Sequence, residues 1–137
     1  LKVRIATWCN YYGWGNSHYP VKFDSYKAQS PTLSEYIYYD ADEIWNEIDR
    51  ILIEDKKQKF TPGQNIYYNM NFFCNPKFFY DPQIENYIEE YFISTKFNLP
   101  IASTVYSSDA TTIDVFRLIS EEMMACDKRS KEIAHGK

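Results

Sequence analysis

Residues 41–52 carry the clearest helical periodicity in the chain. Apolar side chains recur at the i, i+3, i+4 and i+7 spacing that aligns them on one helical face: Ala41, Ile44, Trp45, Ile48, Ile51 and Leu52. The preceding segment Asp40-Ala-Asp-Glu43 matches a capping box, and lysines crowd the expected end of the helix. The pattern therefore predicts a helix over residues 41–58 that buries Trp45 at the centre of its apolar face.

Two further segments are predicted as helices. Asp81 followed by Pro82 is typical of an N-cap and a proline at the first helical position, so we expect a helix over residues 82–96. Residues 109–128 form the other helix, and the polar segment 129–137 is expected to fray. Four apolar residues are expected on the inner face of this last helix: Ile113, Phe116, Ile119 and Met123.

Three segments are predicted as strands: residues 2–9, 65–73 and 101–106. In the first two, apolar and polar side chains alternate, which is typical of a half-buried strand. One face of the first strand would carry Val3, Ile5 and Thr7, and the matching face of the second would carry Ile66, Tyr68, Met70 and Phe72.

The order of these elements predicts an α+β fold. Buried parallel strands are nearly all apolar, whereas the first two predicted strands alternate, so a doubly wound parallel sheet is disfavoured. We expect a single small domain over residues 1–137, with a mixed three- to four-stranded sheet and about three helices packed mainly on one face. The loop after the first strand, or residues 21–30, would supply the fourth strand.

Charge and cysteine content limit the classes of partner. The formal net charge is −4, and basic residues near the N-terminus form only a small set: Lys2, Arg4, Lys22 and Lys27. A nucleic-acid partner is therefore disfavoured. No apolar run approaches the roughly 18 residues of a membrane span, which disfavours a membrane partner. Cys9, Cys74 and Cys126 are an odd number and widely spaced, which favours reduced thiols and a cytoplasmic location.

The sequence offers no motif for catalysis, metal binding or a cofactor. Gly13-Trp14-Gly15 lacks the third glycine of a nucleotide-binding loop. His18 and His135 lie far apart and no Cys-x-x-Cys pair accompanies them, although a site built from Cys9, His18 and Cys74 is conceivable. A Cys9–His18 pair would lack a third, orienting group. We therefore expect no catalytic residue, no metal and no cofactor, and the sequence favours a binding protein over an enzyme.

The predicted binding surface is centred on residues 8–20, a segment rich in Trp and Tyr. Large aromatic side chains beside Asn and Arg are typical of recognition surfaces. If the first two strands are neighbours, one polar sheet face and the loop that follows it would bring together nine residues: Arg4, Trp8, Tyr11, Tyr12, Trp14, His18, Tyr67, Asn69 and Asn71. The alternatives are a homodimer seam and an aromatic lid over the core.

These features lead to two functional hypotheses. The chain is rich in Phe, Tyr, Ile, Asn and Lys, residues largely encoded by AT-rich codons, which favours a phage or mobile-element origin. The first hypothesis is a small non-catalytic cytoplasmic protein that acts as a stoichiometric inhibitor of a host factor. It would bind a protein partner or self-associate as a homodimer or larger assembly. The second is a protein or enzyme that binds a nucleotide or sugar through the aromatic loop.

Overall fold

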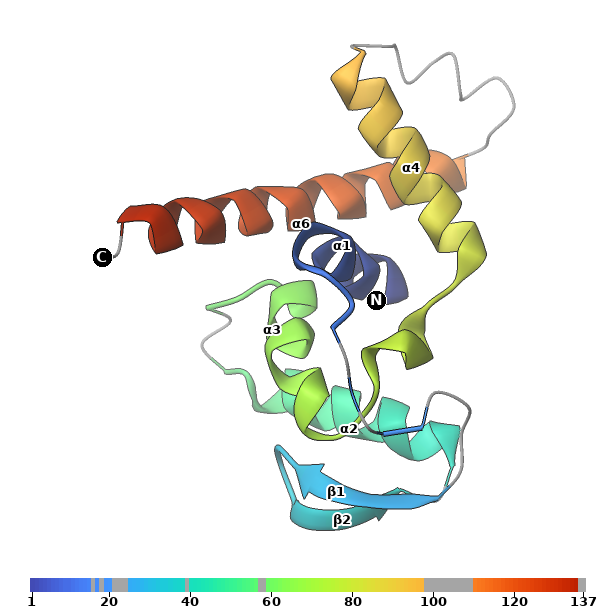
Figure 1. The fold of residues 1–137 in the computed structure, drawn as a ribbon, viewed down its shortest axis with the longest axis vertical. Helices are drawn as coiled ribbons and strands as arrows, with labels where there is room; N and C mark the ends of the chain where they lie inside the picture. The colour runs from blue at the N-terminus through green and yellow to red at the C-terminus, as the bar shows by residue number, and fades with distance from the viewer. Residues whose placement is uncertain are drawn as a thin grey trace.

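The fold is mostly helical, and the described residues contain one two-stranded antiparallel sheet (Figure 1). The computed structural model describes residues 1–15, 17, 19–20, 25–38, 40–56, 59–97 and 110–135. Its elements are α1 (Lys2–Tyr12), β1 (Tyr26–Ser30), β2 (Ser34–Tyr38), α2 (Ala41–Glu54), α3 (Pro62–Asn69), the 3-10 helices η1 (Met70–Phe72) and η2 (Pro76–Phe79), α4 (Pro82–Lys96) and α6 (Ala110–His135).

The expected α+β fold with a three- to four-stranded sheet is wrong. Residues 2–9, predicted as a strand, lie in helix α1, and residues 65–73 lie in α3, η1 and the residue after them. The strand expected at 101–106 falls outside the described residues. The observed sheet is a hairpin, in which β1 and β2 pair antiparallel with Tyr26 opposite Tyr38 and Ser30 opposite Ser34.

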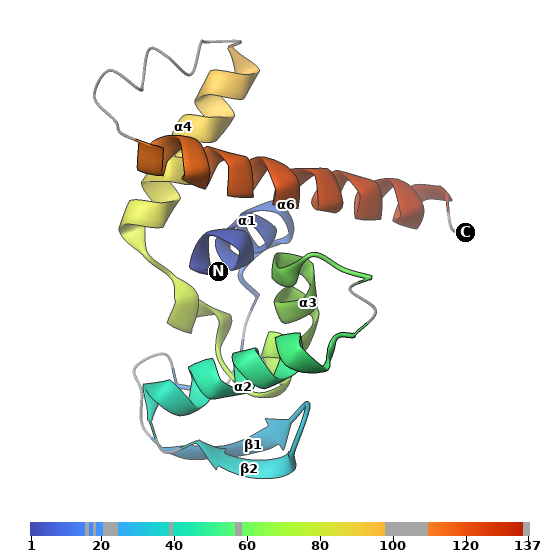
Figure 2. The same cartoon turned by 180° about the vertical axis from the view of Figure 1, so that it is seen from behind.

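Helix α1 occupies the centre of the helical part of the molecule. It packs against α6, α3 and α4, and both views show it enclosed between them (Figures 1 and 2). Five consecutive residues, Ile5 to Cys9, are buried. A helix that is enclosed on several sides has no continuous polar face, so it shows no amphipathic period. The alternation in this segment therefore predicted a strand where the chain forms a helix.

Helix α3 begins, like α4, with an N-cap side chain followed by a proline. This signal was used to predict a helix from the sequence only for α4. The Thr61 hydroxyl accepts a hydrogen bond from Gln64 N at 3.3 Å, and Pro62 occupies the first helical turn. Ile66, Met70 and Phe73 are fully buried, and their spacing follows the helical period into η1. The Thr61-Pro62-Gly63 segment is thus a helix start.

The predicted helix over residues 41–58 is observed as α2, which ends earlier, at Glu54. Asp40 caps it by accepting a hydrogen bond from Glu43 N. Ile44, Ile48 and Ile51 form its buried stripe. Trp45 lies at the edge of that stripe instead of its centre, half-buried against Phe78 and Phe79, with ring centroids 6.2 and 5.5 Å away.

A buried carboxylate joins α2 to the hairpin. Glu47 is fully buried, and its oxygens accept hydrogen bonds from the hydroxyls of Ser30, Thr32 and Tyr38 and from the Arg50 guanidinium. Burial opposes the charged form, but the hydrogen bonds from these four donors hold the pKa of Glu47 below its ordinary value. One side chain therefore fixes both strands against the helix.

Helices α4 and α6 confirm the two remaining helix predictions. Helix α4 has the predicted bounds, and Asp81 caps it. Helix α6 does not fray at residue 129 but continues to His135, and its second half extends beyond the rest of the fold (Figures 1 and 2). Phe116 and Ile119 are buried as expected, whereas Ile113 is half exposed.

Candidate functional site

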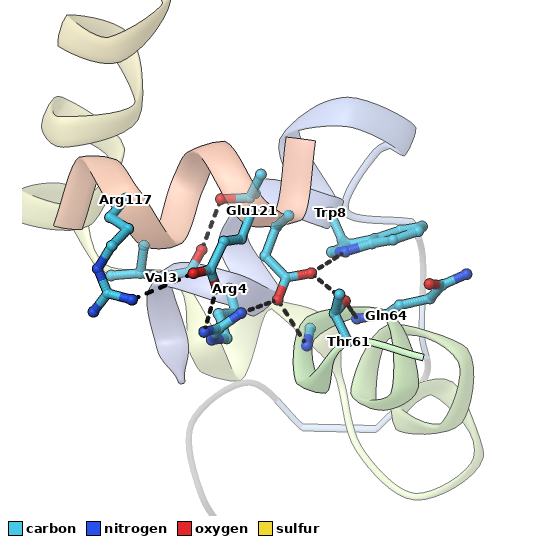
Figure 3. Close-up of polar contacts among 10 residues, drawn as sticks. Val3, Arg4, Trp8, Thr61, Gln64, Arg117 and Glu121 are labelled. Carbon is cyan, nitrogen blue, oxygen red and sulfur yellow. Dashed lines mark hydrogen bonds and ion pairs between the residues drawn. The ribbon is translucent and has the colours of Figure 1, made fainter. Parts of the chain in front are cut away.

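A second buried carboxylate holds α6 against α1 and α3. Glu122 is fully buried. Its oxygens accept hydrogen bonds from Trp8 Nε1 at 2.7 Å, Arg4 Nη1 at 2.7 Å, Gly63 N at 3.2 Å and the Thr61 hydroxyl (Figure 3). Four donors from two helices and a helix cap thus satisfy one carboxylate, which is how a buried charge is tolerated in a protein interior.

Arg4 links this network to the surface. Its guanidinium binds Glu122 and, through Nη2, the carboxylate of Glu121 at 2.8 Å. Burial disfavours its charge, but the hydrogen bonds to Glu122 and Glu121 raise the pKa of Arg4 overall. Glu121 also lies 3.3 Å from Arg117 (Figure 3). The charge of Glu121 is therefore balanced by two arginines.

Beside this network, the second half of α6 and the start of α3 enclose a groove of about 660 Å³, which we call the α6 groove. One wall consists of Lys59, Phe60, Thr61 and Gln64. The other wall consists of Glu121, Met124, Ala125, Lys128, Arg129 and Glu132. A volume of this size lies within the range of ligand-binding clefts.

The α6 groove combines exposed apolar surface with a basic rim. Met124 is 71% exposed, and Phe60 lies on the opposite wall. Lys59 and Lys128 are exposed and form no ion pair with another described residue. The walls contain two acidic side chains, Glu121 and Glu132, and Glu121 is already paired with two arginines. An acidic or amphipathic group would therefore find both apolar contact and opposite charge here.

Arg129 gives one end of the groove a fixed cation. Its guanidinium lies 5.0 Å from the ring centroid of Tyr12 and 5.1 Å from that of Tyr68. Contact with two aromatic faces restrains the side chain and places its charge beside the groove. Tyr68 in turn accepts a hydrogen bond from Gln64 Nε2 at 2.8 Å, which orients the groove wall.

The residues of the predicted binding surface do not share a sheet face, because that sheet does not exist. Trp8 is fully buried, and its ring lies 5.5 Å from Tyr12 and 5.6 Å from Tyr67. These three rings form the seam between α1 and α3. The two segments predicted as neighbouring strands are therefore neighbouring helices.

The other predicted surface residues are dispersed. Tyr11 donates a hydrogen bond to Asp127 of α6 at 2.9 Å. Trp14 is half-buried against the Tyr80 ring. Asn69 donates to the carbonyl oxygen of Asn65 one helical turn earlier. Two residues remain: Asn71 is exposed, and His18 lies outside the described residues.

Sequence reasoning did not select Phe60, Met124 or Lys128. A signal was present for one of them, because Met124 follows Met123, which was expected on the inner face of the helix. Adjacent helical residues point about 100° apart, so Met124 lies off the expected inner face. An apolar residue on the outer face of a helix is a candidate contact residue. Phe60 lies in a connection whose course depends on tertiary packing.

The cysteines are buried and free. Burial raises the pKa of Cys9 to about 12, so its thiol stays protonated at neutral pH. Across the residues that the structure describes, no cluster of three His, Cys, Asp or Glu side chains is arranged to hold a metal ion. Within those same ranges, no helix combines the length and the apolar character needed to cross a bilayer.

Comparison with protein-family models, with curated proteins and with solved structures finds no match to this chain.

Proposed function

We propose that this protein is a non-catalytic binding protein whose α6 groove receives a helical segment of another protein chain. The observation that carries the proposal is Met124, an exposed apolar side chain beside a groove whose rim holds Lys59 and Lys128. Exposed methionines are common at protein-binding surfaces because the flexible thioether adapts to its partner. A helix laid in a groove is a recurrent mode of recognition.

The rigidity of the surrounding structure supports this proposal. The buried Glu122 network fixes α6 relative to Thr61 and Gly63, so the two walls of the groove are held in place before a partner arrives. A preformed site loses less conformational entropy on binding. Free, buried thiols suit a reducing compartment, so the proposal includes a cytoplasmic location. It also includes stoichiometric inhibition of another protein as the consequence of binding.

Site-specific photocrosslinking tests the proposal. A photoreactive residue is placed at Met124, and a matched one at Ile53, which is 76% exposed on α2 and lies outside the groove. In cells that express the protein, we expect position 124 to crosslink to a discrete protein and position 53 not to do so. Lys128→Glu should abolish the adduct, and Lys77→Glu should not. Equal crosslinking at both positions, or an adduct unaffected by Lys128→Glu, would contradict the proposal.

A thermal-shift screen tests the small-ligand alternative. The volume of the α6 groove would also suit a nucleotide or sugar. The protein-binding proposal predicts no change in melting temperature with saturating nucleotides or sugars. A shift of several degrees that Phe60→Ala removes would favour the small ligand instead.

A further inference from the structure

Helix α4 presents an exposed stripe of acidic and apolar side chains on the face turned away from the core. The stripe consists of Asn86, Glu89, Glu90 and Ile93 on the helix and Phe97 at its C-cap, all of them exposed. Phe97 is 63% exposed and Ile93 is 43% exposed. The spacing 86, 90, 93 and 97 follows the i, i+4, i+7 pattern of helices that dock in grooves. We call this set the α4 stripe.

The opposite face of α4 is already occupied. Ile88 is buried, and the Tyr91 ring packs edge-on against Phe116 of α6 with centroids 5.8 Å apart. Phe116 belongs to the first half of α6, whereas the α6 groove lies along the second half. Figure 1 shows α4 crossing α6 near the start of α6, far from the C-terminal end of that helix. The stripe and the groove are therefore separate surfaces of one chain.

The two surfaces are complementary in charge and in chemistry. The stripe carries Glu89 and Glu90, which form no ion pair with any residue in the described part of the chain, and one cation borders it, Lys96, whose Nζ lies 5.5 Å from the Phe97 ring centroid. The groove presents Lys59 and Lys128, likewise unpaired there. Both surfaces add exposed apolar groups, with Phe97 and Ile93 on one and Met124 on the other. Opposite charges around apolar anchors are the arrangement of a specific protein interface.

We propose that the occupant of the α6 groove is the α4 stripe of a second copy of this chain. The inference rests on the proposed function and names its partner. Because the two contact surfaces differ, a single contact between two copies leaves one groove and one stripe of the pair open. If both contacts form between the same two copies, the assembly closes as a two-fold dimer; if they form with different copies, it grows into a larger ring or an open filament.

Two variants that each remove one surface test this assembly. The groove variant is Lys59→Glu with Lys128→Glu, and the stripe variant is Ile93→Ser with Phe97→Ser. All four positions are exposed, so both variants should fold, which circular dichroism and a melting curve check. Matched controls are Lys77→Glu for the charge change and Ile53→Ser for the apolar change.

Sedimentation equilibrium provides the measurement. We expect the mass of the wild-type protein and of the two controls to rise with concentration above that of the monomer. Each variant alone should weaken association by on the order of tenfold or more, because hot-spot and charge contacts are lost. An equimolar mixture of the two variants should form a species of twice the 16.3 kDa monomer mass. It should grow no further, since each variant retains the surface that the other lacks.

The outcomes separate this inference from the proposed function. A wild-type protein that stays monomeric, or folded variants that form no mixed dimer, would overturn the second-copy assignment. If position 124 still crosslinks to a different protein and Lys128→Glu abolishes that adduct, the groove binds another chain and only its assigned occupant is wrong. If no adduct forms at position 124 and the groove variant associates like the wild type, both proposals fail.

Discussion

Glu122 is the residue on which the arrangement of α6 depends. Its two oxygens accept hydrogen bonds from Trp8, Arg4, Thr61 and Gly63, all of them donors. Glu122→Gln places an amide N–H against one of these donors and leaves Arg4 with less opposing charge. Since breaking a buried ion pair leaves an uncompensated charge, we expect a loss of about 3–5 kcal/mol in the free energy of unfolding.

Urea denaturation measures this loss, and the neighbouring residue provides the control. Glu121 has the same side chain and binds the same arginine, but 42% of its side chain is exposed. Glu121→Gln should therefore cost less than about 1 kcal/mol. Equal losses for the two substitutions would show that Glu122 is not the structural centre of the α1, α3 and α6 junction.

Glu47 should give the hairpin a pH-dependent anchor. Its pKa in the folded protein is lower than the ordinary value of 4.5, so the unfolded chain binds its proton more readily. The stabilisation is therefore fully present above about pH 4.5 and is lost as the pH falls through the folded pKa. At neutral pH, Glu47→Gln should cost about 1.5–3 kcal/mol through its lost charged hydrogen bonds.

The expected sign is that the stability difference between wild type and Glu47→Gln shrinks as the pH falls from 7 towards 3. Denaturant unfolding at a series of pH values gives this difference directly, because the other carboxyl groups are common to both proteins. A difference that stays constant or grows on acidification would contradict the assigned role of Glu47.

At the scale of elements, the contact between α3 and α6 depends on Gly63. A Cβ atom added there would lie 2.7 Å from the Glu122 carboxyl group and 2.8 Å from the carbonyl oxygen of Arg4. Replacing glycine by alanine inside a helix ordinarily stabilises it by up to about 1 kcal/mol. Gly63→Ala should instead lower the free energy of unfolding by about 1–3 kcal/mol, because a backbone atom limits relaxation. A melting temperature equal to or above that of the wild type would exclude this close approach.

Sequence periodicity correctly predicted the helices that have one solvent-exposed face, and it gave the wrong secondary structure for the enclosed helix. Helices α2 and α4 expose a polar side, so the periodicity of their buried residues and their N-caps could be recognised in the sequence. Helix α1 is enclosed, and the alternation of Val3, Ile5 and Thr7 then resembled a strand. For α3 the pattern was ambiguous, because Ile66 and Met70 satisfy both the two-residue and the four-residue period. Thr61 before Pro62 was the cap signal that could have decided between them.

The candidate site was less accessible from the sequence than the helices were. Trp8 and Tyr67 were grouped because their segments were expected to be neighbouring strands. The two side chains are indeed in contact, but across the interface between two helices. The α6 groove joins the segment before α3 to the second half of α6, which lies about sixty residues later. No local pattern reports a contact across that separation, so Phe60 and Met124 could not be paired before the fold was known.

At the scale of the whole molecule, the proposed assembly joins the basic rim of the α6 groove to the acidic α4 stripe of another copy. The chain as a whole is acidic, with a net charge of −4. Contacts between Lys128 and the acidic stripe would lie near solvent and be screened by salt, since the Debye length falls from about 10 Å at 0.1 M to about 3 Å at 1 M. Raising the ionic strength over this range should weaken self-association, as measured by sedimentation. Association that strengthens with salt would indicate a mainly apolar interface elsewhere.

Hydrogen–deuterium exchange at low and high protein concentration locates the contact between copies in the unmodified chain. We expect exchange to slow with increasing concentration in two places: the α6 groove (residues 59–64 and 121–132) and the α4 stripe (residues 86–97). The hairpin β1–β2 and helix α2 should exchange at the same rate at both concentrations. Slower exchange confined to the hairpin or α2, with no change along the α6 groove, would contradict a contact between the α6 groove and the α4 stripe.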